Sequence, residues 1–268
     1  MIIIGEKING AIPSVAKAIA ERDSEFIRDL AVSQAEAGSS YIDICASVED
    51  RIELETLKWL IGLAEEATDV PVAVDSPNAA VCAQAVKFCS RPGLINSVSC
   101  EGNKIDIVFP AIAQTEWGCV ALLCDDSGIP GTAEKRLEIF EKIIDRAKEF
   151  NIDPSRLYID PLVEMLCTSD NGINMILEVI SEIKDRYPSV HVTGAVSNVS
   201  FNLPARKVIN QGFVLYAMQA GLDSAIFDPL NKDMTGMIYA SEALLGKDRR
   251  CLKYIKAHRK GLFGSAKK

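Results

Sequence analysis

The sequence has very little histidine, and its cysteines form no metal-binding pattern. The 268 residues include two histidines, His191 and His258, and eight cysteines without a Cys-x-x-Cys pair. No His/Cys cluster has the spacing of zinc ligands, so we expect no bound metal ion. The cysteines lie mostly in apolar stretches, which predicts reduced, buried thiols rather than disulfides. His191 comes early in a predicted strand, and we interpret it as a packing residue rather than a catalytic base.

The sequence also lacks long hydrophobic runs and a basic amino terminus. No stretch approaches the roughly 18 uncharged apolar residues that span a bilayer, and residues 1–6 lack the basic start of a signal peptide. The formal net charge of −8 argues against nucleic-acid or anionic-membrane partners. The basic stretch 247–268 is interpreted as a short, solvated helical tail. These features together predict a cytoplasmic protein.

A third absence concerns nucleotide-binding motifs, because no G-x-G-x-x-G opens any predicted helix. Short β-branched runs alternate with longer helical patterns, and no linker or change of composition interrupts them. With few aromatic residues, the core must be built from Ala, Val, Ile and Leu. We predict one α/β domain, a (β/α)8 TIM barrel over residues 1–268, with an open doubly wound sheet as the alternative. The predicted strands are 2–4, 41–45, 70–74, 93–97, 119–124, 157–159, 190–196 and 224–227. The predicted helices are 13–36, 53–67, 78–89, 105–116, 132–150 (capped by Thr132), 174–187, 206–220 and 234–245.

Several predicted strands run into a carboxylate or an amide. Any one of these residues is more often a helix cap or turn former than a ligand. In a parallel barrel, however, the carboxyl ends of all strands meet at one mouth, which is where barrel enzymes keep their active sites. The strand-end residues are Glu6, Asp43, Asp75, Asn96, Asp160 and, after the apolar run 190–196, Asn198.

A pterin ring suits such a mouth because its amino group and ring N–H are adjacent donors and its carbonyl is an acceptor. Asp75 and Asp160 can accept from the donors, and Asn96 can donate and accept at once. The amide of Asn198 can either donate to a nitrogen lone pair or accept from a protonated nitrogen. This property suits a reaction in which charge appears or disappears on a ring nitrogen.

Five short motifs occur in a fixed order along the chain. They are Gly5-Glu6-Lys7-Ile8-Asn9-Gly10, Asp75-Ser76, Ile95-Asn96-Ser97, Tyr158-Ile159-Asp160-Pro161-Leu162 and Ser197-Asn198-Val199-Ser200. In this order the motifs resemble the pterin-binding methyltransferases, which include corrinoid-protein methyltransferases and the folate domain of cobalamin-dependent methionine synthase. The resemblance implies a barrel that binds tetrahydrofolate or 5-methyltetrahydrofolate, with a corrinoid (cobalamin) protein docking over the same mouth, and a homodimer.

The resemblance also implies roles for individual residues. Asn198 matches the catalytic asparagine placed against N5 of the folate. The pterin-binding set that it implies is Asp75, Asn96, Asp160, Asn198, Glu6, Ser197, Gly194 and Arg206. Cys45 and Phe201 depart from the branch that serves the corrinoid/iron–sulfur protein, which favours transfer from a methylcorrinoid protein to tetrahydrofolate. Two alternatives stay open, a dihydropteroate synthase-like enzyme and a non-catalytic folate-binding subunit.

Overall fold

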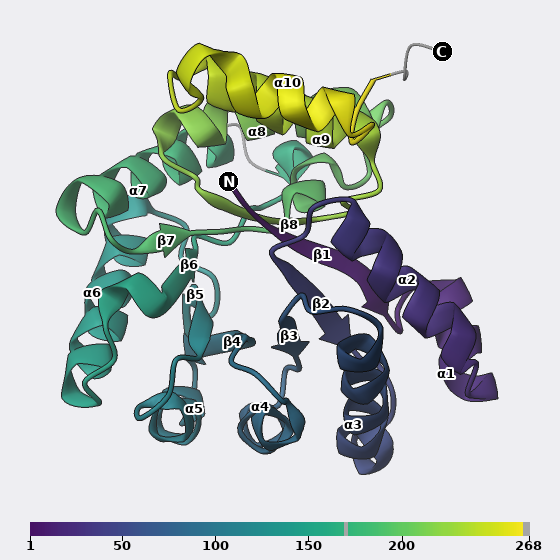
Figure 1. Cartoon of the computed structure of the whole chain (residues 1–268). Helices are drawn as coiled ribbons and strands as arrows, with labels where there is room; N and C mark the ends of the chain where they lie inside the picture. The colour runs from purple at the N-terminus through teal and green to yellow at the C-terminus, as the bar shows by residue number, and fades with distance from the viewer. Residues whose placement is uncertain (169–170, 265–268) are drawn as a thin grey trace.

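The computed structural model, which describes residues 1–168 and 171–264, is a parallel β-barrel surrounded by helices (Figure 1). The strands pair in parallel in the order β7-β6-β5-β4-β3-β2-β1-β8. A bridge between Ala195 and Ile226 closes the barrel between β7 and β8. The predicted (β/α)8 fold is therefore confirmed. The strands are β1 (Ile2–Asn9), β2 (Tyr41–Cys45), β3 (Val72–Asp75), β4 (Leu94–Cys100), β5 (Gly118–Asp125), β6 (Leu157–Asp160), β7 (His191–Val192) and β8 (Ser224–Phe227).

The helices form the layer around the barrel (Figure 1). They are α1 (Pro13–Glu21), α2 (Ser24–Glu36), α3 (Asp50–Ala67), α4 (Ala79–Ala85), α5 (Lys104–Ile112), α6 (Ala133–Glu149), α7 (Gly172–Arg186), α8 (Arg206–Ala220), α9 (Lys232–Leu244) and α10 (Leu252–Arg259). Short 3-10 turns are η1 (Val86–Phe88), η2 (Pro154–Arg156), η3 (Leu166–Thr168), η4 (Val196–Ser200) and η5 (Arg249–Cys251).

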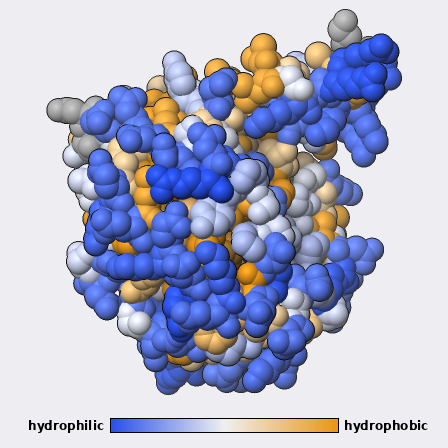
Figure 2. All heavy atoms as spheres, turned by 90° about the vertical axis from the view of Figure 1, so that its left-hand side faces the viewer, coloured by the Kyte–Doolittle hydropathy of each residue, from blue (hydrophilic) through white to orange (hydrophobic). Residues whose placement is uncertain are grey.

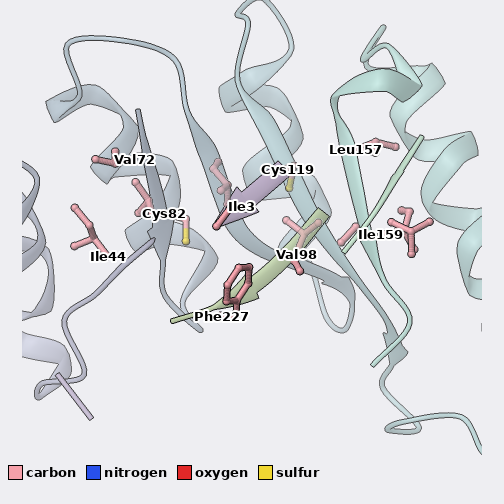
Figure 3. Packing of buried hydrophobic residues seen from close by; sticks show 14 of the residues in the cluster. Ile3, Ile44, Val72, Cys82, Val98, Cys119, Leu157, Ile159 and Phe227 are labelled. Carbon is pink, nitrogen blue, oxygen red and sulfur yellow. The ribbon is translucent and has the colours of Figure 1, made fainter. Parts of the chain in front are cut away.

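The apolar core has two layers because successive side chains of a strand point to opposite faces. Between the strands and the helices lies the larger layer, to which Ile3 contributes (Figure 3). Ile4, the next residue of β1, points the other way, into a small apolar plug inside the barrel. The plug consists of Ile4, Ala73, Leu94, Val120, Tyr158 and Ile226. It seals the barrel interior below the carboxyl ends of the strands.

Several boundaries differ from those expected. β1 continues to Asn9, so Glu6 lies within the strand rather than beyond its end. The single helix predicted up to residue 36 is two helices, because Arg22 takes a left-handed conformation (φ 54°) and Asp23 caps α2 by accepting from the Phe26 amide. Thr132 caps α6 as expected, by accepting from the Lys135 amide.

The predicted strand 190–196 is the least regular one. Only His191–Val192 pairs continuously with β6, and Val196–Ser200 forms the turn η4. Beyond Val192, the Gly194 carbonyl accepts from the Ile226 amide at 3.0 Å, so the segment crosses over to β8 and closes the barrel. By contrast, helix 206–220 and strand 224–227 have the predicted bounds.

The carboxyl-terminal segment packs on the barrel instead of forming a wholly solvated tail. Phe263 is buried and stacks on Tyr239 of α9, with 5.6 Å between ring centroids. Residues 265–268 of the expected tail lie outside the described residues. The face that Figure 2 shows is mostly hydrophilic, with apolar side chains in small groups. In the part of the chain that the structure describes, no helix is long and apolar enough to cross a membrane.

Candidate functional site

A polar layer lies directly above the apolar plug of the barrel. Six strands each place one residue in the apolar plug or in contact with it. Two positions further along the chain, each of these residues is followed by a carboxylate or an amide. Because side chains alternate along a strand, these polar groups also turn toward the barrel axis. They are Glu6, Asp43, Asp75, Asn96, Asp160 and Asp228, which follow Ile4, Tyr41, Ala73, Leu94, Tyr158 and Ile226. The barrel mouth is therefore rich in hydrogen-bond acceptors.

One part of this layer is a group of coupled side chains on β2, β3 and β4. Asp75 is the register partner of Asn96, and the Asn96 amide nitrogen donates to Asp43 Oδ1 at 3.1 Å. Burial, and then the charge of Asp75, raise the pKa of Asp43 well above its ordinary value. Burial raises the pKa of Asp75 to about 6, against a hydrogen bond with Cys45. Asp75 therefore exchanges its proton close to neutral pH, and the pKa of Asp43 is shifted in the same direction.

Cys45 stays a thiol in this group. Its burial, and then the charge of Asp75, raise the pKa of Cys45 to about 12, and its sulfur lies 3.2 Å from the Ser47 hydroxyl. A thiol with such a high pKa is a weak nucleophile but can still donate a hydrogen bond. Cys45 therefore acts as a neighbour of Asp75 rather than as a reactive group.

A second part of the mouth is a cavity of about 370 Å³ that Asp160 and Asn198 both line. Asp160 Oδ1 accepts from the Leu162 amide at 2.7 Å, and burial raises the pKa of Asp160 to about 6. A side chain at Gly194 would come within 3.2 Å of Val163 and 3.7 Å of Asp160 Oδ1. The absence of a side chain there keeps space free beside the carboxylate. The rest of the wall is formed by Ile129, Leu162, Val163, Glu164, Met165, Thr168 and Phe201.

A neighbouring cavity of about 240 Å³ contains the remaining predicted residues, Glu6, Ser197 and Arg206. The Arg206 guanidinium donates to the Ser197 carbonyl at 2.8 Å and to the Ser200 hydroxyl at 3.0 Å. Burial, and then the nearby charge of Asp228, raise the pKa of Glu6. The turn η4 lines both cavities, with Asn198 in one and Ser197 in the other.

The structure thus brings all the predicted site residues to the carboxyl end of the barrel, divided between the polar layer and two adjacent cavities. Asp43 and Asp228 belong to the same layer and are missing from the binding set predicted from sequence. Counting two positions along each strand from its inward apolar residue would have identified both. His191 is elsewhere, at the start of β7, where it pairs with Asp223 at 3.1 Å and stacks on Tyr158.

Within residues 1–168 and 171–264, no three His, Cys, Asp or Glu side chains are arranged to hold a metal ion. The inward carboxylates instead face the mouth as hydrogen-bond acceptors, and Asp43 and Asp75 act on one another through their charges. Such an arrangement suits an organic ligand that carries several N–H donors.

The chain matches a family model described as pterin binding enzyme over residues 7–228. It is 48% identical over 266 residues to the methylcorrinoid:tetrahydrofolate methyltransferase of Eubacterium limosum, covering 98% of both chains. It is also 30% identical over 240 residues to the methionine synthase of Mycobacterium tuberculosis, covering 84% of this chain and 20% of that protein.

Solved structures with a similar fold include two dihydropteroate synthases. The enzyme of Xanthomonas albilineans in complex with 7,8-dihydropteroate has a TM-score of 0.68 and 18% identity, covering 91% of this chain and 92% of that one. The enzyme of Yersinia pestis has a TM-score of 0.67 and 17% identity, covering 92% and 93%. At such identities, the likeness concerns the fold alone.

Proposed function

The chain belongs to the pterin binding enzyme family, and we propose that it transfers a methyl group from a methylcorrinoid protein to N5 of tetrahydrofolate. In this proposal the whole chain, residues 1–268, is one pterin-binding domain. The observation that carries the proposal is that Asp160, a pterin-anchoring position, and Asn198 line the same cavity at the barrel mouth. A pterin held by Asp160 therefore lies within reach of the Asn198 amide.

The polar layer provides the groups that bind the pterin. Asp75 and Asp160 accept hydrogen bonds from its amino group and ring N–H. Asn96 donates one of its two amide hydrogens to Asp43, and its carbonyl oxygen accepts from the ligand. The order of these groups around the barrel fixes the orientation of the ring, and Glu6, Gly194, Ser197 and Arg206 border the space on the side of β8 and η4.

Methyl transfer to N5 is a displacement reaction. The N5 lone pair attacks the methyl carbon, the electron pair of the carbon–cobalt bond stays on the corrinoid, and N5 becomes cationic until it loses its proton. The protein has to align the two substrates and stabilise the charge at N5. The Asn198 carbonyl oxygen accepts from the protonated N5, and solvent takes the proton afterwards.

A corrinoid protein has to cover the cavity for this reaction, and the cavity rim is suited to a protein partner. Ile129 and Phe201 line the cavity and are more than half exposed, and Leu166, which follows the lining residue Met165 in the chain, is also exposed. Exposed apolar side chains around a cavity that also holds polar groups are typical of surfaces that are covered by a partner. Docking there would exclude water from the methyl carbon and N5.

We further propose that the protein is a cytoplasmic homodimer. All eight cysteines are free thiols, as expected in a reducing compartment. Exposed apolar side chains on α8, α9 and α10 offer a surface for a second copy, namely Val208, Tyr216, Leu244 and Leu252. Sedimentation of the wild-type protein and of Tyr216→Lys checks this surface, since the charged variant should be monomeric.

The test of the proposed function is spectroscopic. Mixing the protein with tetrahydrofolate and free methylcobalamin should remove the methyl–cobalt absorption band and produce 5-methyltetrahydrofolate. A folate-binding subunit would bind tetrahydrofolate and leave the band unchanged. A dihydropteroate synthase would instead consume a pterin pyrophosphate together with p-aminobenzoate. Either result would contradict the proposal.

Replacement of Asn198 tests its catalytic role. We expect Asn198→Ala to lower turnover by about 10- to 100-fold, because one preorganised polar contact to a developing charge is lost. Tetrahydrofolate affinity should change much less. The matched control is Asn174→Ala, the same change at an exposed position of α7. An equal loss of affinity and turnover would mean that Asn198 only binds the ground state.

A further inference from the structure

Arg136 of α6 is a charged side chain with no solvent-exposed surface. Its Nε donates to the Pro130 carbonyl at 3.0 Å, and its Nη1 donates to the carbonyls of Pro161 and Leu162. Nη2 forms an ion pair with Glu164 at 3.4 Å. The guanidinium therefore ties the loop before α6 to the segment 161–164 that follows β6.

The segment that Arg136 holds begins directly after Asp160. Leu162 has φ 63°, a left-handed conformation that is unfavourable for a residue with a side chain. Two contacts hold it there from opposite sides. Its amide donates to Asp160 Oδ1 at 2.7 Å, and its carbonyl accepts from Arg136 at 2.9 Å.

This arrangement determines which oxygen of Asp160 is available. Oδ1 is occupied by the Leu162 amide, and among the described residues no other hydrogen bond reaches the Asp160 carboxylate. Oδ2 is therefore the oxygen that can face a ligand. The same segment also lines the cavity, through Leu162, Val163 and Glu164. A change in the segment would move the carboxylate and the cavity wall together.

The positive charge of Arg136 also favours the ionised form of Asp160. Burial raises the pKa of Asp160 to about 6, while the Leu162 amide and the charge of Arg136 oppose that rise. The other titratable groups that face the guanidinium are Glu164 and Cys124. Burying a guanidinium is unfavourable for stability, and an apolar residue of similar volume often stabilises a protein as well or better. A role of Arg136 at the binding site would explain why a buried arginine is found at this position.

We propose that Arg136 is a positioning residue, which acts through the segment 161–164 to present Asp160 Oδ2 to the pterin. This inference rests on the proposed function, because it assigns a residue to the binding of its folate substrate. Arg136 itself does not line either cavity of the mouth. Its effect on the ligand therefore passes through Asp160.

The test compares Arg136→Met and Arg136→Lys with the wild-type protein, by measuring the dissociation constant of tetrahydrofolate from pH 5 to 8. In Arg136→Met we expect affinity to fall about tenfold at pH 7, and the midpoint of its pH dependence to rise by about one unit, because the nearby positive charge is gone. Arg136→Lys keeps the positive charge but lacks the planar guanidinium with its several N–H donors. It should keep the midpoint and recover only part of the affinity.

The matched control is Arg156 of η2, which donates to the Trp117 and Ile112 carbonyls at the opposite, amino end of β6. Arg156→Met should lower stability without moving the affinity or its pH midpoint. If Arg136→Met does not fold, Arg136→Lys decides, and wild-type affinity in that variant would overturn the proposal. Unchanged affinity and midpoint in a folded Arg136→Met would also overturn it. Failure of the wild-type protein to bind tetrahydrofolate would instead refute the proposed function, and this inference with it.

Discussion

The buried carboxyl groups of the polar layer lower the stability of the folded protein. Asp43 and Asp160 are both buried, and burial is the largest cause of the raised pKa of each. A raised carboxyl pKa means that the ionised form is less stable in the folded protein than in the unfolded chain. The layer thus stores unfavourable free energy, which a ligand with N–H donors relieves when it binds.

Asp160→Asn tests, at a single residue, whether a buried carboxylate lowers stability and strengthens ligand binding. At pH 7 the amide should increase the free energy of unfolding of the ligand-free protein by about 1–3 kcal/mol, because a buried charge with a pKa near 6 is removed. Tetrahydrofolate should bind at least about tenfold more weakly, since the acceptor loses its charge. Urea unfolding and ligand titration measure the two effects. The control Asp185→Asn, at an exposed position of α7, should change neither, and a less stable Asp160→Asn protein would contradict this account.

At the scale of elements, local irregularities decide where side chains point. β4 pairs with β5 with a register shift between Asn96 and Val98. As a result Asn96 faces the mouth, while Val98 packs in the outer layer against the helices (Figure 3). β1 has a similar shift between Gly5 and Ile8, after Glu6. In both strands the polar residue keeps the inward position and the following apolar residue is returned to the outer core.

The break between α1 and α2 is another such irregularity, and its cap can be tested. Asp23 accepts from the Phe26 amide at 3.1 Å and so satisfies one of the free amides at the start of α2. We expect Asp23→Ala to lower the free energy of unfolding by about 1 kcal/mol. Tetrahydrofolate affinity should not change. Asp29→Ala, an exposed position of the same helix, is the control, and equal losses from both variants would exclude a capping role.

At the scale of the whole molecule, barrel closure concentrates the carboxylates at one end. Side chains from β1, β2, β3, β6 and the end of β8 meet there, although they come from distant parts of the chain. Their proximity raises the pKa of Glu6 and of Asp43 beyond the effect of burial, through Asp228 and Asp75 respectively. No single strand would produce these shifts.

The stability of the ligand-free protein should therefore depend on pH in a defined direction. The folded-state pKa values of Asp75 and Asp160 are about 6, above the ordinary value of 3.8. Between these values the folded state binds more protons than the unfolded chain, so their contribution to stability falls as pH rises from about 4 to about 6. Tetrahydrofolate affinity should rise over the same range, because ionised carboxylates are the better acceptors.

Urea unfolding at pH 5 and pH 7 measures this effect. The difference between the wild-type protein and the double variant Asp75→Asn/Asp160→Asn isolates it from the other acidic groups. In the double variant, the free energy of unfolding should fall much less between pH 5 and pH 7 than in the wild-type protein. If both proteins show the same pH dependence, the two carboxylates are not the source.

The sequence by itself determined the number and order of the βα units, because hydrophobic periodicity and capping residues act locally. Helix 206–220 and strand 224–227 were predicted with their observed bounds for this reason. Ordered motifs also placed Asp75, Asn96, Asp160 and Asn198 at the mouth, since the carboxyl ends of parallel strands must meet.

Only the tertiary structure decided which groups act on one another. Glu6 lies within β1, because pairing with β2 and β8 extends that strand beyond its apolar run. Arg136 reaches the segment after Asp160 from a neighbouring βα unit, and no local pattern links the two. The raised pKa values follow from burial and charge proximity across strands. These quantities depend on distances through space, which periodicity along the chain does not encode.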